Sequence, residues 1–151
     1  MVKQKIYLDT TIPSAYFDDR APDRQKLTRD FWNERLLSFI PMISTIVQIE
    51  IKDTPDLEKR INMENLVKEF EVLIPNDESD KLAQEYVDKG IFSEKFASDA
   101  NHVAIAVVNG INFLASWNFR HLVKVNTRRE VNLINALKGY WQIEIIVPPE
   151  L

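Results

Sequence analysis

Three acidic residues that lie far apart in the sequence could together bind a divalent cation: Asp9, Glu50 and Asp99. The chain has no cysteine, and its two histidines are not clustered, so carboxylate oxygens are the ligands that remain. Oxygen ligands of this kind select Mg²⁺ or Mn²⁺ rather than zinc. A cation held by a few carboxylates keeps several waters and meets phosphate oxygens, which is the arrangement for phosphodiester hydrolysis. We therefore predict these three acids as metal ligands and catalytic residues.

Asp9 ends the apolar stretch of KIYLDTT, residues 5–11, where a strand is expected to lead into a helix. Ligands of open parallel sheets bind beyond the carboxyl ends of the strands, so this position suits a site residue. The alternative is structural, because aspartate is common in turns and at helix N-caps. Taken alone, the stretch leaves both interpretations open.

Glu50 belongs to the expected helix 45–53. With about 100° per residue, the apolar side chains from Ile46 to Ile51 point on average to within about 10° of Glu50. This predicts a carboxylate in the middle of the buried face. An unpaired buried carboxylate costs several kcal/mol or takes up a proton, so an arginine, a proton or a cation must compensate it. A fully solvated glutamate disagrees with this placement.

Asp99 opens the helix that contains SDANHVAIAVV. It lies at the edge of the expected buried face, about a quarter turn from its centre. Its alternative role is that of an acid stabilised by the helix dipole. His102 falls on the polar side of the same helix, and we interpret it as a surface residue.

The segment LASWN ends the fourth expected strand and brings two more candidates, Ser116 and Asn118. Both would face the same crevice as Asp9. The alternative for Asn118 is a turn residue, which is its more common use. We interpret Trp117 as part of the core or its rim rather than as a platform for base stacking, which stays the second possibility.

The elements that must position these residues alternate along the chain. Strands are expected at 5–8, 40–43, 70–74, 112–116 and 144–147. Helices are expected at 13–17, 24–38, 45–53, 56–69, 78–89, 94–109 and within 128–137. Gly90 and Gly110 are typical residues just past a helix end. Strands separated by helices predict an α/β fold: a parallel sheet of about five strands with helices on both faces, in a single domain over residues 1–151.

Composition limits the class of protein. The chain has 151 residues, 45% hydrophobic and 28% charged, which is ordinary for a soluble globular domain with a real core. The N-terminal residues contain no apolar stretch long enough for a signal peptide, and the apolar run 103–108 is too short to span a bilayer. With no cysteine, disulfides are excluded. These features predict a cytoplasmic protein without a membrane segment.

The net charge of −4 means that a nucleic-acid substrate would need a local basic patch. Residues 118–129 contain no acid and offer His121 and four cationic side chains. We predict the four as contacts to a nucleic-acid backbone: Arg120, Lys124, Arg128 and Arg129. The alternative is a solvated surface, which explains many runs of like charge.

These residues resemble those of the PIN-domain ribonucleases, of the VapC-like toxin type in type II toxin–antitoxin systems. The resemblance covers nearly the whole chain. It depends on four segments in the same order: IYLDTTIPSAYF, STIVQIEI, SDANHVAIAVVNGINFLASWNFRHL and the final VPPEL. Each motif alone is weak, and their order and spacing together are fairly specific. The family's first acid falls on Asp9, its helix glutamate on Glu50 and its third acid on Asp99.

The resemblance implies a three-layer α/β/α PIN-like fold and Mg²⁺- or Mn²⁺-dependent cleavage of single-stranded RNA. It also implies a homodimer and a cognate antitoxin that blocks the acidic groove. The family's fourth acidic position often reads T-x-D, whereas this chain has Ser116, Trp117 and Asn118. Asn118 keeps an oxygen but loses a charge, which puts a second metal in doubt without implying inactivation. Ser116 and Asn118 are predicted to position the cation or the scissile phosphate.

Three other classes of protein fit less well. A haloacid-dehalogenase-like phosphatase needs an aspartate two residues after the first, where this chain has Thr11. A receiver-like signalling domain needs a paired acid beside Asp9 and a lysine after the last strand, and this chain has neither. A non-catalytic PIN module that binds RNA or a partner protein is the main alternative, favoured slightly by Asn118 and by the negative charge. Three clustered acids argue against it, because without a cation they repel an RNA backbone.

Overall fold

The computed structural model describes residues 2–151 and contains one parallel sheet of five strands. The strand order is β3-β2-β1-β4-β5, so the first strand in sequence lies at the centre. All five strands were expected from the sequence, and each end lies within one residue of its predicted position. Their bounds are β1 Gln4–Leu8, β2 Phe39–Ser44, β3 Glu71–Leu73, β4 Phe113–Ala115 and β5 Glu144–Ile146.

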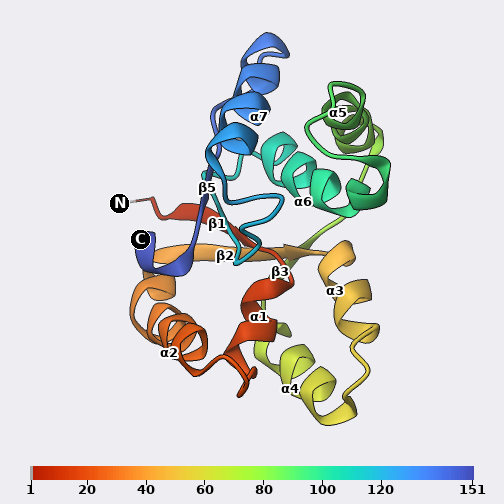
Figure 1. Cartoon of the computed structure of the whole chain (residues 1–151). Helices are drawn as coiled ribbons and strands as arrows, with labels where there is room; N and C mark the ends of the chain where they lie inside the picture. Colours follow the sequence, from red (N-terminus) through yellow and green to blue (C-terminus); the bar gives the residue numbers. More distant parts are fainter. Residues whose placement is uncertain (1) are drawn as a thin grey trace.

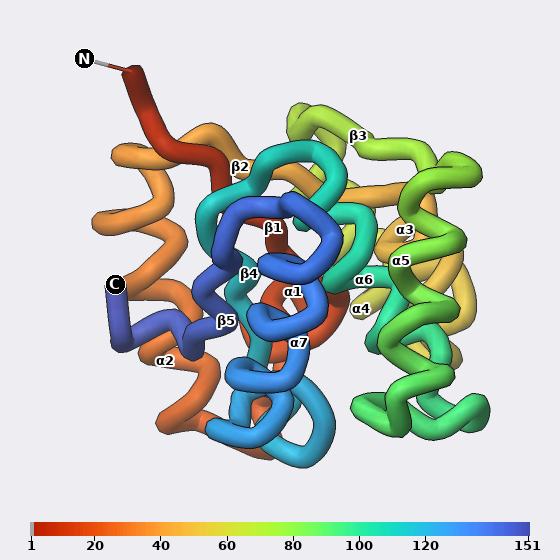
Figure 2. The backbone as a smooth tube through the Cα atoms, turned by 90° about the horizontal axis from the view of Figure 1, so that it is seen from above, coloured from red at the N-terminus to blue at the C-terminus, as the bar shows by residue number. Residues whose placement is uncertain are grey.

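Helices cover both faces of the sheet, which confirms the predicted three-layer α/β/α fold. In Figure 1, α5, α6 and α7 lie on one face, and α1, α2 and α4 lie on the other. Seen from above, α2 and α5 lie at opposite ends of the molecule, and α7 covers β4 and β5 (Figure 2). The helices are α1 Thr11–Tyr16, α2 Pro22–Asp30, α3 Thr45–Lys52, α4 Leu57–Val67, α5 Asp77–Asp88, α6 Ala97–Val108 and α7 Val125–Leu137.

The core is centred on β1, where Ile6, Tyr7 and Leu8 are fully buried. Strands buried on both faces are expected to read as continuous apolar runs. Helix α6 is buried along almost its whole length from Ala100 to Val107, since it packs on the sheet and against α5. None of the helices in residues 2–151 is long and apolar enough to cross a membrane.

Some helices differ locally from the prediction. The expected helix 24–38 is divided into α2, a π-helical turn (Phe31–Arg35) and a 3₁₀ turn (Leu36–Ser38). A 3₁₀ turn (Glu94–Phe96) precedes α6. Gly90 and Gly110 follow α5 and α6 with φ of 78° and 69°, a conformation that favours glycine and ends both helices as predicted.

The register of the strands brings the first site residues together. Leu8 of β1 pairs with Ala115 of β4, so the residues that follow, Asp9 and Ser116, emerge side by side at the carboxyl edge of the sheet. The backbone N–H of Asp9 continues the ladder by donating to the carbonyl of Ala115 at 3.3 Å. Strand β2 ends at the same edge in Ser44, which caps α3 by accepting the N–H of Ile46 at 3.2 Å.

Candidate active site

Hydrogen bonds link Asp9 to Asp99 across the carboxyl edge of the sheet. The hydroxyl of Ser116 donates to Asp9 Oδ2 at 2.5 Å. The same hydroxyl oxygen accepts the backbone N–H of Asn118 at 2.9 Å. The side-chain amide of Asn118 then donates to Asp99 Oδ1 over a longer distance of 3.4 Å. Four residues that the sequence singled out are thus brought together.

Glu50 joins this group from α3, through residues next to the other two acids. Thr10, which follows Asp9, donates its hydroxyl to Glu50 Oε1 at 2.5 Å. Ser98, which precedes Asp99, donates its hydroxyl to Glu50 Oε2 at 3.0 Å. Glu50 thus contacts the neighbours of Asp9 and Asp99 rather than those acids themselves, and this brings the three predicted acids to one edge of the sheet. We call this group the acidic cluster: Asp9, Glu50, Asp99, Ser116 and Asn118.

Asp9 is the most buried acid of the cluster, at 3% exposure. One carboxylate oxygen accepts the N–H of Thr11 at 3.0 Å and also its hydroxyl, and the other accepts from Ser116. Burial nevertheless raises the pKa of Asp9, because it outweighs the charge of His102 and the hydrogen bonds from Ser116 and Thr11. The folded protein therefore holds this carboxylate at a cost in free energy.

The sequence predicted Glu50 in the middle of the buried face of α3. In the structure it lies at the border of that face. Val47 and Ile51 are buried, whereas Ile49 is 58% exposed. The buried direction is set by the first two, which places Glu50 towards α6. The error came from counting Ile49 as a core residue. The side chain of Glu50 is 35% exposed.

The charge of Glu50 is compensated by His102, a residue that sequence analysis placed on the surface. His102 is 2% exposed, and its Nε2 lies 2.8 Å from Glu50 Oε1. The prediction was wrong because α6 packs against neighbours on nearly all sides, so its polar side is not exposed. The signal was available: a helix that is apolar almost all round is a buried helix, and a histidine within it needs partners.

A buried chain of hydrogen bonds fixes the His102 ring. Its Nδ1 lies 2.6 Å from the hydroxyl of Tyr7, which in turn lies 2.8 Å from the hydroxyl of Ser44. Glu50 is ionised at neutral pH and can only accept, so Nε2 carries a proton. Burial lowers the pKa of His102, but the hydrogen bond and charge of Glu50, with the charges of Asp9 and Asp99, raise it by more. Ser44, Tyr7 and His102 thus form a support for Glu50.

The compensation of Glu50 predicts an acid dependence of stability. Burial raises its pKa, but the hydrogen bond and charge of His102, with the hydroxyls of Thr10 and Ser98, lower it from 4.5 to about 2. The stabilisation is therefore fully present above about pH 4.5 and is lost as the pH falls towards about 2. In Glu50→Gln we expect the free energy of unfolding to fall less than in the parent between about pH 6 and pH 3. Urea unfolding at both pH values measures this, and equal losses in the two proteins would contradict it.

Asp99 has the most available oxygen atoms of the three acids. It is half-buried, and the 3.4 Å bond from Asn118 is its single side-chain hydrogen bond found among residues 2–151. Burial raises its pKa, His102 and His121 partly oppose this, and the charge of Glu50 raises it further. Its negative charge is thus less well balanced than that of Glu50.

Asn118 is oriented as a donor towards the cluster. The backbone N–H of His121 can only donate, and it donates to the side-chain oxygen of Asn118 at 2.9 Å. The amide nitrogen of Asn118 therefore faces Asp99. The oxygen that sequence analysis offered as a ligand is therefore used within the loop. Trp117 is 8% exposed and donates its indole N–H to Thr28 at 2.9 Å, which agrees with its interpretation as a core residue.

The residues fit a hard cation by their chemistry, but they do not form a finished cage. All three acids offer oxygen, and Asp9 and Asp99 carry charge that the protein leaves partly uncompensated. In residues 2–151, however, no three acidic or histidine side chains are grouped closely enough to hold a metal ion as they stand. Carboxylates of the cluster would have to turn from their hydrogen-bond donors towards the cation.

The predicted nucleic-acid contacts lie on the loop after Asn118 and on α7. Arg120, Lys124 and Arg129 are exposed, and Arg128 is half-buried. No hydrogen bond or salt bridge within the described chain joins them to the acids. They remain predictions as backbone contacts.

Comparison with known proteins confirms the fold. Neither a protein-family model nor a curated protein matches the sequence. One similar structure is the crystal structure of VapBC2 from Rickettsia felis bound to a DNA fragment from the VapBC2 promoter. A chain in it is 14% identical to this protein with a TM-score of 0.55, and the match covers 95% of this chain and 98% of that one. A chain in DNA-bound VapBC from Salmonella typhimurium is 18% identical with a TM-score of 0.54, covering 96% and 98%. At these identities the likeness shows the PIN-like fold alone.

Proposed function

We propose that this chain, which has the fold of the VapC-like PIN domains, is a metal-dependent endoribonuclease that cleaves single-stranded RNA. One observation carries the proposal. Three carboxylates from separate segments lie in one cluster at the carboxyl edge of the sheet, and within residues 2–151 only Glu50 among them has a cationic partner, His102. A divalent cation would supply the missing positive charge, and phosphate oxygens would complete its coordination.

In this proposal Asp9, Glu50 and Asp99 would hold Mg²⁺ or Mn²⁺, directly or through water. Such a cation, when bound, would lower the pKa of a bound water to give the nucleophile and would stabilise the leaving oxygen. Ser116 orients the Asp9 carboxylate by its hydrogen bond, and Asn118 does the same for Asp99. His102 keeps Glu50 ionised and fixes its direction, as residues behind a metal ligand commonly do.

We further propose that the protein acts as the toxin of a toxin–antitoxin pair, with a cognate antitoxin as its partner and a homodimer as its assembly. The two similar structures support the antitoxin partner, because both are VapBC assemblies bound to DNA. In the same scheme Arg120, Lys124, Arg128 and Arg129 contact the RNA backbone.

Cleavage of a labelled single-stranded RNA tests the proposal. Products are expected with Mn²⁺ or Mg²⁺ and are expected to vanish with EDTA, because the acids alone repel the phosphate. Activity should return when excess Mn²⁺ is added back to the EDTA-treated protein. Cleavage that continues at full rate in EDTA would contradict metal dependence.

The second candidate is a non-catalytic module that binds RNA or a partner protein. It is favoured by the Glu50–His102 pair at 2.8 Å, which compensates one acid without any cation. The same assay separates the two, since a binding module retards RNA in a gel with Mn²⁺ present and leaves its length unchanged.

A further inference from the structure

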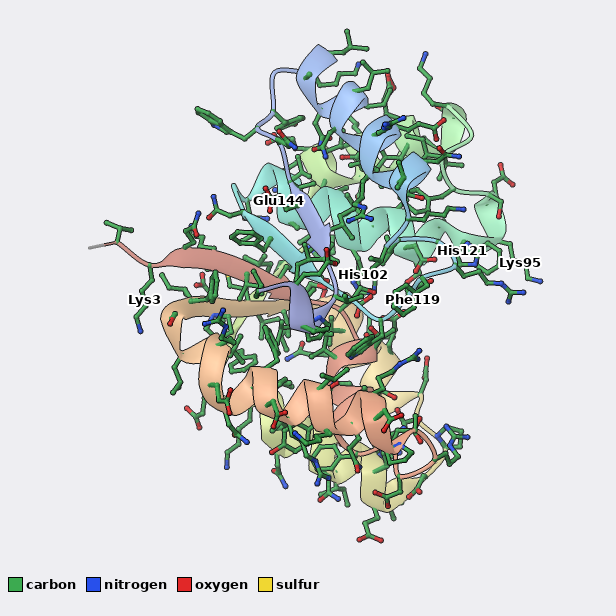
Figure 3. The ribbon with its side chains drawn as sticks, turned by 60° about the vertical axis from the view of Figure 1, so that its left-hand side comes forward. Lys3, Lys95, His102, Phe119, His121 and Glu144 are labelled. Carbon is green, nitrogen blue, oxygen red and sulfur yellow. The ribbon has the colours of Figure 1, made fainter. Side chains whose placement is uncertain are left out.

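Phe119 is an exposed aromatic ring beside the acidic cluster. The side chain of its neighbour Asn118 reaches Asp99, whereas Phe119 points outward and is 51% exposed. Figure 3 shows Phe119, His121 and Lys95 on the same side of the molecule, with Lys3 on the other. A large apolar ring in water next to a polar site needs a reason, because burying it is favourable.

The loop holds Phe119 in this outward position. On one side, the backbone N–H of Trp117 donates to Thr11 Oγ1 at 2.8 Å, and its indole is buried against Thr28. On the other side, the carbonyl of Asn118 accepts the N–H groups of Leu122 and Val123 at 3.1 and 2.8 Å. With both flanks fixed, the backbone at Phe119 is already ordered, so only its side chain has to be immobilised when the ring binds a ligand.

A cation accompanies the ring. The guanidinium carbon of Arg24, on α2, lies 5.8 Å from the centre of the Phe119 ring and 5.1 Å from that of Trp117. Arg24 makes no salt bridge among residues 2–151, so its charge remains available. The guanidinium lies over both rings, so a base that stacks on the exposed part of Phe119 would have a positive charge near its phosphate.

A second aromatic pair lies near the Asn118–Asp99 contact, because the backbone N–H of His121 donates to the side-chain oxygen of Asn118. The rings of Phe96 and His121 are 3.9 Å apart between centres and inclined by 30°. Lys95 places its ammonium 5.7 Å from the Phe96 ring. Phe119 adjoins Asn118 in the sequence and Phe96 lies just before Asp99. Aromatic rings with adjacent cations therefore come from both chain segments that form the Asn118–Asp99 contact, and such combinations of rings and cations bind single nucleic-acid strands.

We infer that Phe119 is the stacking surface for a nucleobase next to the scissile phosphate. The inference rests on the proposed function, because the phosphate is taken to lie at the acidic cluster. It adds the reason for a single-stranded substrate: bases in a duplex are stacked on one another, whereas an unpaired base can stack on a protein ring. It also names a residue that no acid motif indicates.

Binding of a short RNA strand containing 2-aminopurine tests the inference. The full chain carries Asp9→Asn so that the strand stays intact, and Mg²⁺ is present. Phe119→Leu keeps an apolar side chain but removes the aromatic face. We expect it to weaken binding about tenfold and to reduce the quenching of 2-aminopurine fluorescence. Phe119→Tyr should bind within about twofold of the parent because it keeps the ring.

Trp141→Ala is the matched control. Trp141 is 88% exposed and precedes β5, so it lies at the amino edge of the sheet, away from the acidic cluster. It should change neither affinity nor quenching. A strand with an abasic site at the probe position should lose its sensitivity to Phe119→Leu.

Three results would overturn the inference: no binding of the strand, affinity and quenching unaffected by Phe119→Leu, or an equal loss for the abasic strand. The inference would also be overturned if Phe119→Leu left binding of the RNA strand unchanged but blocked assembly with a partner protein, because the ring would then belong to a protein interface. The proposed function is judged separately by cleavage with the unmodified chain. Quenching that depends on Phe119 without any cleavage would keep Phe119 as a base-stacking surface but remove the nuclease, and with it the scissile phosphate.

Discussion

Asp9→Asn is expected to lower RNA cleavage by about 100-fold or more without unfolding the protein. The change removes one negative charge from the acidic cluster and one anionic oxygen from the proposed metal site. Loss of groups that only support a metal costs about 10- to 100-fold, and loss of a ligand should cost at least as much. Initial rates at saturating Mn²⁺, measured on the same single-stranded RNA, give the ratio.

The fold should survive this change because asparagine has nearly the same shape. Its side-chain oxygen can still accept from Thr11, and its amide can donate to the Ser116 hydroxyl. The substitution also removes a buried charge whose pKa is raised by burial, so the melting temperature should stay equal or rise. A gain in stability with a loss of activity is the signature of a residue kept for function.

Asp53→Asn is the matched control for Asp9→Asn. Asp53 is exposed just past α3, so the same exchange alters the same net charge away from the cluster. It should leave the rate unchanged within about twofold, because exposed charges are screened by salt. Equal rates for Asp9→Asn and the parent would remove Asp9 from the mechanism and end the nuclease proposal.

His102→Ala is expected to cost about 3 kcal/mol of unfolding free energy. The substitution empties a buried volume, leaves the hydroxyl of Tyr7 without its partner and takes the nearest cation from Glu50. For a chain of this size the loss corresponds to a fall in melting temperature of about 6 to 12 °C. Thermal and urea unfolding at neutral pH both measure it.

Two further variants make the His102 experiment specific. Tyr7→Phe removes one hydroxyl from the same chain of hydrogen bonds, so a smaller loss of about 1 to 2 kcal/mol is expected. Asn101→Ala changes the neighbouring position of α6, where no side-chain hydrogen bond is found in the described part of the chain, and should have little effect. If His102→Ala were as mild as Asn101→Ala, the buried chain would not contribute to stability.

The strands could be predicted because they are short apolar runs with clear punctuation. KIYL ends in Asp9, the third strand is followed by Pro75, and the last is followed by Pro148. Gly90 and Gly110 marked two helix ends. These signals are local, since proline and a left-handed glycine restrict the backbone wherever they occur.

The faces of helices were harder to predict than their existence. In α4, Leu57 and Ile61 are spaced to share one helical face, but they are 57% and 46% exposed, whereas Met63 and Val67 are buried. The same difficulty misplaced Glu50 and His102. Periodicity identifies an apolar side only when one side is apolar, and α3, α4 and α6 each carry apolar residues in several directions.

The sequence alone determined the order of strands and helices, the parallel α/β class and the identity of three acids at positions typical of PIN domains. Only the tertiary structure decided how those acids are compensated: His102 and Tyr7 support Glu50, while Asp9 and Asp99 keep unbalanced charge. The physical reason is range. Backbone preferences act over a few residues, whereas the free energy of a buried charge depends on every dipole and charge that folding brings around it.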